Sequence, residues 1–159
     1  MKSFSKKTLP PHNFSFLDDF IAGSARPYNI ENLSFLKNQG IRYIVSATTK
    51  PLGLVTSKKG KSQMKYLFLQ ISNLPTSPQI KNFLELIREA KDSDSKVLVH
   101  CQFGQERTGI LLAIYLMEFC KMSVVEAIKY VHTNRPTSLK SSDSIDFLVD
   151  YGENCHHSN

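Results

Sequence analysis

The segment VLVHCQFGQERTGILLAIYL, residues 97–116, restricts the possible folds of this chain more than any other. It opens with a short apolar run that ends at His100 and closes with a longer apolar run after Thr108. Short apolar runs rich in β-branched residues favour buried strands, and longer ones favour buried helices. Residues 101–107 join the two. Because ligands of open α/β sheets bind beyond the carboxyl ends of strands, this connection is the expected position of a binding site.

Strand-type and helix-type segments alternate along the rest of the chain. Strands are expected within residues 19–27 and at 41–47, 66–72 and 96–100, helices at 29–40, 77–92, 107–120, 123–134 and 141–151, and a polar loop at 48–65. This alternation predicts an α/β fold with a central, largely parallel sheet flanked by helices. A length of 159 residues favours a single domain.

The cysteines and the apolar runs limit the setting in which the protein works. Three cysteines at wide spacing, with no C-x-x-C pair, indicate neither a disulfide framework nor a zinc site. The N-terminal residues lack the apolar stretch of a signal peptide. The longest apolar run, residues 110–117, is too short to span a bilayer. We therefore expect an intracellular protein, cytoplasmic and/or nuclear, with no bound metal and no membrane insertion.

A net charge of +6 favours anionic partners without choosing among them. Four lysines crowd into residues 58–65, but no aromatic residue interleaves with them, so nucleic acid is disfavoured as a partner. The tripeptide at 60–62, Gly-Lys-Ser, resembles the end of a nucleotide-binding loop. That loop also requires a glycine at position 55, where this chain has Val55.

The chemistry of the connection comes from a thiol, a glycine, an arginine and a helix start. Backbone N–H groups and the helix dipole attract an anion at such a helix start. Gly104 allows the loop to curl, and Arg107 provides a planar fork for phosphate oxygens. Cys101 lies in the same positive field, which favours a nucleophilic thiolate. Cys101 could instead be an inert buried thiol, but the presence of Gly104 and Arg107 in the same segment makes this alternative less favoured.

The decapeptide HCQFGQERTG, residues 100–109, matches the pattern H-C-x5-R-[ST]-G and resembles the signature of the cysteine-dependent protein tyrosine phosphatases. Within that superfamily the chain resembles the small atypical dual-specificity phosphatases over residues 13–151, which would leave 1–12 as an N-terminal extension and 152–159 as a C-terminal tail. The segments that carry this resemblance are NFSFLDDFIAGSARP, LKNQGIRYIVSAT, QIKNFLELIREA and NRPTSL. The resemblance implies a protein tyrosine phosphatase-like fold, no cofactor and a phosphorylated protein as substrate.

The resemblance also implies a role for each residue of the signature. Cys101 would form a phosphocysteine intermediate, and the Thr108 hydroxyl would stabilise its thiolate as the leaving group of the second step. His100 would brace the loop by hydrogen bonding, although a purely structural role for it is equally open. The phosphoryl group would be bound by the Arg107 side chain and by the backbone N–H groups of Gln102, Phe103, Gly104, Gln105, Glu106 and Arg107.

The chain departs from these relatives at the general acid. They place an Asp before the cysteine in a loop like I-P-D-F-x-x-P, which protonates the leaving oxygen. Here residues 70–80 read QISNLPTSPQI, so Asn73 occupies the Asp position and the loop is one residue shorter. No Asp or Glu occurs from 66 to 80. Because a general acid or base contributes about 10²- to 10⁴-fold, we expect a slow enzyme.

Two further departures concern charge and water. The Glu106 carboxylate, next to Arg107, would weaken the positive potential of the loop unless it turns away or pairs with a lysine, and it is a less favoured substitute proton donor. Ser144 stands where many relatives have a Gln that helps to place water. Its neighbour Asp143 either takes part in catalysis or, as the favoured alternative, is a helix-start carboxylate.

Three hypotheses remain. The first is a protein phosphatase that hydrolyses phosphotyrosine, and phosphoserine or phosphothreonine as a further option, through Cys101 and with weakened acid catalysis. The second is a phosphate-binding pseudophosphatase that serves as an interaction module. The third is an enzyme like an RNA 5′-triphosphatase, whose leaving group needs no proton. Turnover of an aryl phosphate, with Cys101→Ser as control, separates the first from the second.

Overall fold

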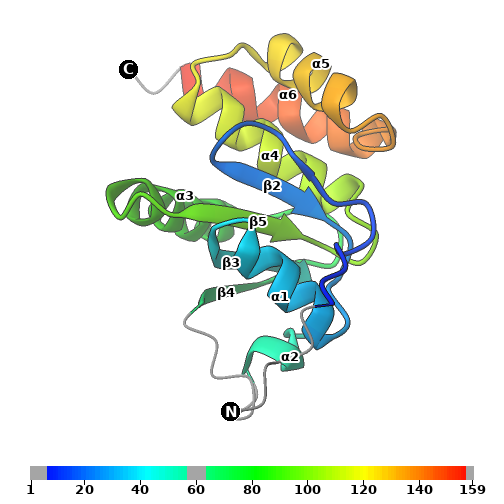
Figure 1. The fold of residues 1–159 in the computed structure, drawn as a ribbon. Helices are drawn as coiled ribbons and strands as arrows, with labels where there is room; N and C mark the ends of the chain where they lie inside the picture. The colour runs from blue at the N-terminus through cyan, green and yellow to red at the C-terminus, as the bar shows by residue number, and fades with distance from the viewer. Residues whose placement is uncertain (1–6, 57–63, 157–159) are drawn as a thin grey trace.

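The computed structural model describes residues 7–56 and 64–156 (Figure 1). Its strands are β1 Ser15–Phe16, β2 Ile21–Ser24, β3 Ile41–Thr48, β4 Lys65–Gln70 and β5 Lys96–His100. Its helices are α1 Ile30–Asn38, α2 Gly53–Thr56, α3 Ser77–Asp92, α4 Glu106–Phe119, α5 Val124–Asn134 and α6 Ser142–His156. The α/β alternation expected from the sequence is confirmed.

The five strands form one sheet in the order β1-β2-β5-β3-β4. Only β1 runs antiparallel to its neighbour. Strand β5 lies at the centre, and His100 at its end pairs with Ser24 of β2 on one side and Ser46 of β3 on the other. Three strands therefore deliver their carboxyl ends to the same edge of the sheet, beside Cys101.

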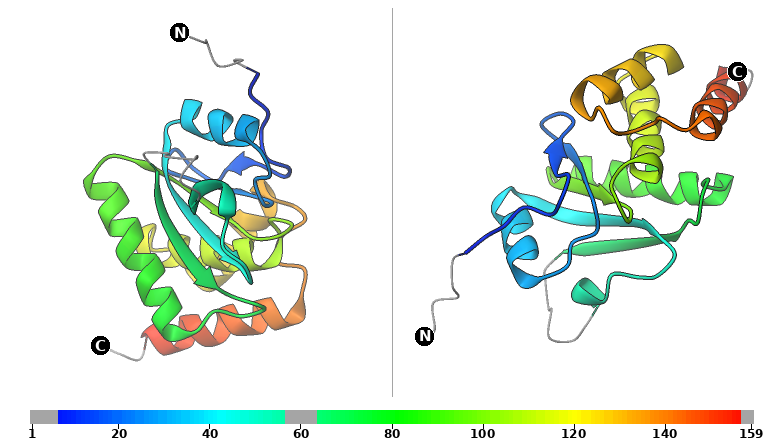
Figure 2. Two further views of the ribbon diagram at one scale, coloured as in Figure 1. Left: turned by 90° about the horizontal axis from the view of Figure 1, so that it is seen from below. Right: turned by 90° about the vertical axis from the view of Figure 1, so that its right-hand side faces the viewer.

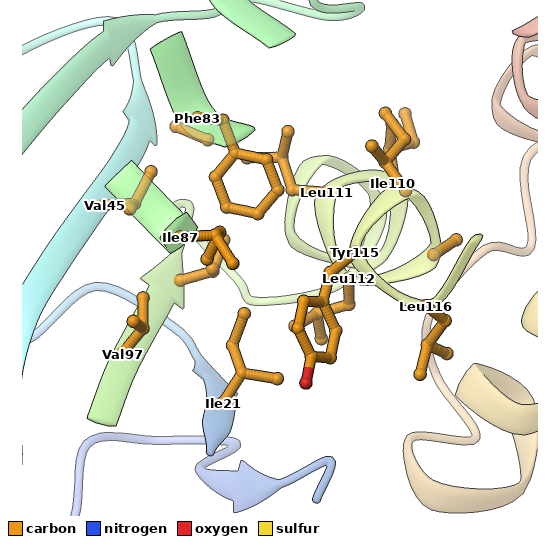
Figure 3. Packing of buried hydrophobic residues seen from close by; sticks show 14 of the residues in the cluster. Ile21, Val45, Phe83, Ile87, Val97, Ile110, Leu111, Leu112, Tyr115 and Leu116 are labelled. Atoms are coloured by element: carbon orange, nitrogen blue, oxygen red, sulfur yellow. The ribbon is translucent and has the colours of Figure 1, made fainter. Parts of the chain in front are cut away.

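Helices cover both faces of the sheet, and the strand residues alternate between two apolar cores because successive side chains point to opposite faces. Val97 and Val99 face the larger core, which α3 and α4 cover, whereas Leu98 faces the smaller core beneath α1. Figures 1 and 2 show α4, α5 and α6 on one side of the sheet and α1 and α2 on the other. In Figure 3, Phe83 of α3 lies against Leu111 of α4.

Helix α4 is buried on all its sides over most of its length. Every residue from Thr108 to Leu116 is buried, because the helix lies between the sheet and the pair α5 and α6 (Figure 1). A helix that is apolar all round needs such a position. The long apolar run in the sequence therefore fixes α4 in the middle of the molecule, and its first turn lies directly beside Cys101.

The ends of two helices follow from their capping residues. The Thr76 hydroxyl accepts a hydrogen bond from the Gln79 backbone at the start of α3, and the Gln79 side chain accepts one from the Thr76 backbone. Ser123 and Glu126 form the same reciprocal pair at the start of α5. Such capping boxes satisfy backbone donors that have no partner inside the helix.

The structure differs from the sequence-based expectation in several places. Strand β1 was not expected, residues 53–56 form helix α2 within the expected loop 48–65, and α6 continues to His156. Strand β4 begins one residue earlier than expected and ends at Gln70, before the connection to α3. Lys58, Lys59 and Lys61, and the Gly-Lys-Ser tripeptide, lie outside the described residues.

Candidate active site

The Cys101 loop, residues 101–107, runs from the end of β5 into the first turn of α4, and its cysteine is 2% exposed. Two donors point at the sulfur. The Gly104 backbone N–H lies 3.2 Å from Cys101 Sγ, and the Thr108 hydroxyl oxygen lies 3.1 Å from it. Donors aimed at a sulfur favour its negatively charged form, as does the N-terminus of α4. The structure thus brings Cys101, Gly104 and Thr108 together as the sequence predicts.

Gly104 shapes the loop. Its φ is +73°, in the left-handed region, and a Cβ there would lie 2.5 Å from the Ser24 carbonyl carbon. The loop therefore runs directly against the end of β2, which leaves no room for a side chain. In this conformation the Gly104 N–H faces the sulfur of Cys101.

We expect Gly104→Ala to lower the free energy of unfolding by about 2 kcal/mol or more and to abolish the sulfur contact, because it combines left-handed strain with a backbone clash. Gly53→Ala is the matched control, since a Cβ at Gly53 meets nothing within 4 Å. Urea denaturation measures both variants. Equal stability of the two would show that the backbone of the Cys101 loop is not held against β2.

Arg135 lies beneath the loop, and the sequence analysis did not identify it as part of the site. It is 2% exposed. Its Nη1 donates to the Ser15 hydroxyl at 2.7 Å and to the Gly23 carbonyl at 3.1 Å. Its Nη2 donates to the Asn13 carbonyl at 2.9 Å and to the Gly104 carbonyl at 2.7 Å. One guanidinium thus fastens the Cys101 loop to β1, β2 and the segment before β1.

The charge of Arg135 also belongs to the site. Burial lowers the pKa of Arg135 to about 10, while negative charge on Cys101 acts in the opposite direction. The guanidinium is therefore protonated at neutral pH, close to the thiol. In the sequence, Arg135 belongs to the segment NRPTSL, which was noted only as part of the family resemblance. An arginine before a proline forms no motif that would by itself indicate a role in the site.

His100 supports the loop from the end of β5. Its Nδ1 lies 3.2 Å from the Cys101 carbonyl oxygen, and its Nε2 is hydrogen-bonded to the Ser46 hydroxyl. A carbonyl only accepts, so Nδ1 carries the proton and Nε2 accepts from Ser46. Burial lowers the pKa of His100 to about 4, assisted by the charges of Arg26 and Arg107 and opposed by its bond to Cys101. The imidazole is thus neutral and holds the backbone at the nucleophile, as a bracing role requires.

The buried neutral imidazole predicts a pH dependence of stability. The unfolded chain protonates His100 near the ordinary pKa of 6.5, and the folded protein does so only near 4. Between those values the unfolded state binds more protons, so the free energy of unfolding falls as the pH is lowered, by about 3 kcal/mol in total.

We expect His100→Asn, which keeps a side-chain donor for the Cys101 carbonyl but does not titrate, to lose this component. Urea denaturation of both proteins from pH 7 to pH 4 measures the difference between them, in which the titration of the carboxylates cancels. Parallel pH profiles would contradict a neutral His100.

Arg107 and its neighbours line a pocket of about 460 Å³ beside the Cys101 loop. Arg107 Nη1 donates to the Ile71 carbonyl at 3.0 Å, so the arginine ties the Cys101 loop to the connection between β4 and α3. The pocket is lined by Arg26, Tyr28, Thr48, Thr49, Lys50, Ser72, Gln102 and Arg107. None of these side chains carries a carboxylate.

Glu106 is turned away from this pocket. Its Oε2 accepts from the Lys140 backbone N–H at 3.0 Å, and its Oε1 accepts from the Ser141 backbone N–H at 2.9 Å. The carboxylate therefore closes the connection between α5 and α6. This position argues against Glu106 as a charge that opposes the anion site and as a substitute proton donor.

Of the other predicted residues, only Gln102 is among those that line the pocket. Asn73 is exposed on the connection between β4 and α3, and its neighbour Ser72 lines the pocket. Gln102 Nε2 donates to the Tyr28 hydroxyl at 3.0 Å, and Phe103 is 68% exposed. Gln105 is exposed at the cap of α4. Asp143 is exposed in the first turn of α6, while Ser144 beside it is buried.

Within the described ranges, no three His, Cys, Asp or Glu side chains are grouped so that they could hold a metal ion. No helix in the part of the chain that the structure describes is long and apolar enough to cross a membrane. Cys101 and Cys120 are both free thiols.

Comparison with known proteins places this chain in a family. The family "Dual specificity phosphatase, catalytic domain" matches residues 25–154. The chain belongs to this family of the cysteine-dependent protein tyrosine phosphatase superfamily. The narrower resemblance to the dual-specificity phosphatase 23 (VHZ) type, which the sequence also suggests, is not confirmed.

Individual relatives agree with the family. The chain is 27% identical over 153 residues to dual specificity protein phosphatase 16 of Homo sapiens, covering 92% of this chain and 22% of the relative. It is 28% identical over 104 residues to dual specificity protein phosphatase CDC14C of Symphalangus syndactylus, covering 65% and 21%. The chain thus spans about a fifth of the length of these relatives. A crystal structure of a mutant form of Tk-PTP shares the fold, with a TM-score of 0.78, 24% identity and coverage of 90% of this chain and 96% of that one.

Proposed function

We propose that the protein is a phosphatase that hydrolyses phosphotyrosine in protein substrates through a phosphocysteine intermediate at Cys101. The observation that carries this proposal is the sulfur held by the Gly104 N–H and the Thr108 hydroxyl at the start of α4. A thiolate in such a position is a nucleophile that can accept the phosphoryl group, and the N–H donors of the loop can bind the phosphoryl oxygens.

The proposed reaction has two steps. The thiolate attacks phosphorus, and the substrate oxygen leaves while Arg107 and the backbone N–H groups of the Cys101 loop stabilise the charge on the phosphoryl oxygens. Water then attacks the phosphocysteine and the thiolate leaves. The Thr108 hydroxyl, 3.1 Å from Sγ, is positioned to stabilise that leaving thiolate. Arg135 and His100 act as positioning residues, because they hold the backbone of the Cys101 loop.

The first step is expected to proceed without a proton donor. Asn73 cannot supply the proton, and no carboxylate lines the pocket. Residues 1–6, 57–63 and 157–159, which the structure does not describe, contain no Asp or Glu either. The leaving oxygen must then depart as an anion, which favours acidic leaving groups and makes phosphotyrosine a slow substrate and phosphoserine a very slow one.

The proposal extends to the setting of the protein. We propose that the catalytic domain spans residues 13–151, that the protein is intracellular, and that its partners are phosphorylated proteins. The contacts of Asn13 with the Cys101 loop support an early start of the domain, because its Nδ2 donates to the Gly104 carbonyl at 3.1 Å. A phosphate-binding pseudophosphatase uses the same cradle and remains the second candidate.

A leaving-group series tests the proposed function. The rate constant kcat on aryl phosphates should fall steeply as the pKa of the phenol rises, and Cys101→Ser should remove turnover throughout. Absence of turnover on every aryl phosphate would overturn the proposed protein phosphatase and favour the pseudophosphatase. A flat dependence would mean that some group does donate the proton, with Asp143 and Glu106 first to be substituted.

A further inference from the structure

The peptide between Phe103 and Gly104, in the middle of the Cys101 loop, is hydrogen-bonded on both of its sides. Its N–H, which belongs to Gly104, lies 3.2 Å from the Cys101 sulfur. Its carbonyl, which belongs to Phe103, accepts a hydrogen bond from Asn13 Nδ2 at 3.2 Å. The peptide is trans, so its N–H and C=O point in opposite directions. The contact with Asn13 and the contact with the sulfur are thus made by the two ends of one planar unit, and turning one end turns the other.

The backbone of the loop does not decide by itself which way this peptide points. Reversing the peptide changes ψ of Phe103 and φ of Gly104, and glycine adopts positive and negative φ about equally readily. In the reversed orientation the Phe103 carbonyl would face the sulfur in place of the Gly104 N–H. A carbonyl dipole opposes a thiolate and a bound anion, whereas an N–H favours both. A donor outside the loop is therefore needed to hold the orientation that the structure shows.

Asn13 provides that donor from the segment before β1. Its side-chain nitrogen carries two hydrogens and lies 3.2 Å from the Phe103 carbonyl oxygen and 3.1 Å from the Gly104 carbonyl oxygen. Both partners only accept, so the amide is oriented with its nitrogen toward the loop. The Asn13 backbone is held as well, because its carbonyl accepts from Arg135 Nη2 at 2.9 Å. Its φ of +55° lies in the left-handed region, which Asn tolerates better than most residues.

The carbonyls on either side of this peptide are held from outside the loop in the same manner. The Gln102 carbonyl accepts from the Arg26 backbone N–H at 3.2 Å. The Gly104 carbonyl accepts from Arg135 Nη2 at 2.7 Å as well as from Asn13. Each of these peptides turns the N–H of the following residue away from its donor, and a row of N–H groups on one side suits an anion. Asn13 differs from the other donors because it acts on the peptide whose N–H reaches the sulfur.

We propose that Asn13 is a positioning residue of the active site, which keeps the peptide between Phe103 and Gly104 turned so that the loop binds an anion and stabilises the Cys101 thiolate. This inference rests on the proposed function, because it concerns the cradle that the reaction uses. It extends the site to the segment before β1, to which the sequence analysis assigned no role. Without the Asn13 donor, a share of the molecules would carry the reversed peptide and would bind a phosphoryl group poorly.

Two variants without the donor test this role. Asn13→Gly keeps the left-handed backbone conformation, and Asn13→Leu keeps the volume of the side chain. The readout is the rate of Cys101 alkylation by iodoacetate, an anion, divided by the rate with iodoacetamide, which is neutral, followed by mass spectrometry. Both reagents attack the same sulfur, so their ratio reports how well the loop attracts an anion. We expect it to fall about 10-fold or more in each variant, as for the loss of one hydrogen bond to a charged group, and kcat/KM on an aryl phosphate to fall with it.

Asp94→Gly and Asp94→Leu are the matched controls and should leave the ratio unchanged. Asp94 is exposed shortly before β5, at the edge of the sheet opposite the Cys101 loop, and its φ is +52°. Thermal unfolding identifies the variants that are folded, and a native ratio in either folded Asn13 variant would overturn the inference.

Alkylation needs no turnover, so the inference and the proposed function are tested separately. A lowered ratio in a protein that turns over no aryl phosphate would overturn the proposed function alone. Turnover by the native protein with an unchanged ratio in the Asn13 variants would overturn the inference alone.

Discussion

Replacing Arg107 with lysine should lower kcat on an aryl phosphate by about 10³-fold or more, the scale of losing donors aimed at transition-state charge in phosphoryl transfer. The guanidinium offers paired donors in a fixed plane, whereas an ammonium is a point charge that does not reproduce them. Arg107 also ties the Cys101 loop to the Ile71 carbonyl, so the variant loosens the pocket wall as well as the cradle. Steady-state kinetics on the purified variant measures the effect.

Arg88→Lys provides the matched control, because Arg88 is exposed on α3 and this substitution, like Arg107→Lys, replaces an arginine with a lysine of the same charge. We expect it to keep the native rate. Both variants should unfold at nearly the same temperature as the native protein, which shows that the loss is chemical. An Arg107→Lys protein with most of its activity would remove Arg107 from the proposed mechanism.

Introducing a carboxylate at the general-acid position should have the second-largest effect. We expect Asn73→Asp to raise kcat on phosphotyrosine by about 10²-fold, the lower estimate for a positioned general acid. The gain should be small on an aryl phosphate with an acidic phenol, whose oxygen needs little help to leave. The pH profile of the variant should acquire a basic limb, because activity then requires a protonated Asp.

Two comparators locate the position from which a proton can reach the substrate. Asn73→Gln introduces no carboxylate and should leave the rate unchanged. Ser72→Asp places the carboxylate on the neighbouring residue, which lines the pocket. A gain in Ser72→Asp with none in Asn73→Asp would show that the short connection between β4 and α3 moves the general-acid position by one residue.

Sequence patterns predicted well where the determining residues are contiguous. The run from Val97 to Leu116 specifies a strand, a loop and a buried helix, since periodicity and apolar length act over a single segment. Gly104 is recognisable in that segment because a tight loop needs a residue that tolerates positive φ. The capping residue Ser123 is recognisable for a similar local reason.

Sequence patterns failed where a short element depends on distant partners. Helix α2 has only the residues 53–56, too few to show a helical period, and it forms where Leu52 is buried against the smaller core. Strand β1 has only Ser15 and Phe16 and exists because β2 offers it a pairing edge. The end of β4 at Gln70 is set by its pairing with Thr48.

The sequence by itself determined the class of protein and indicated the proposed nucleophile and cradle, because Cys101, Gly104 and Arg107 lie within one short segment whose chemistry is local. Only the tertiary structure decided what holds and surrounds that segment. Arg135 reaches the Gly104 carbonyl from a position after α5, and Arg26 reaches the pocket from the end of β2. Such contacts join residues far apart in the chain, and they are fixed by how the helices and the sheet pack rather than by any pattern along the sequence.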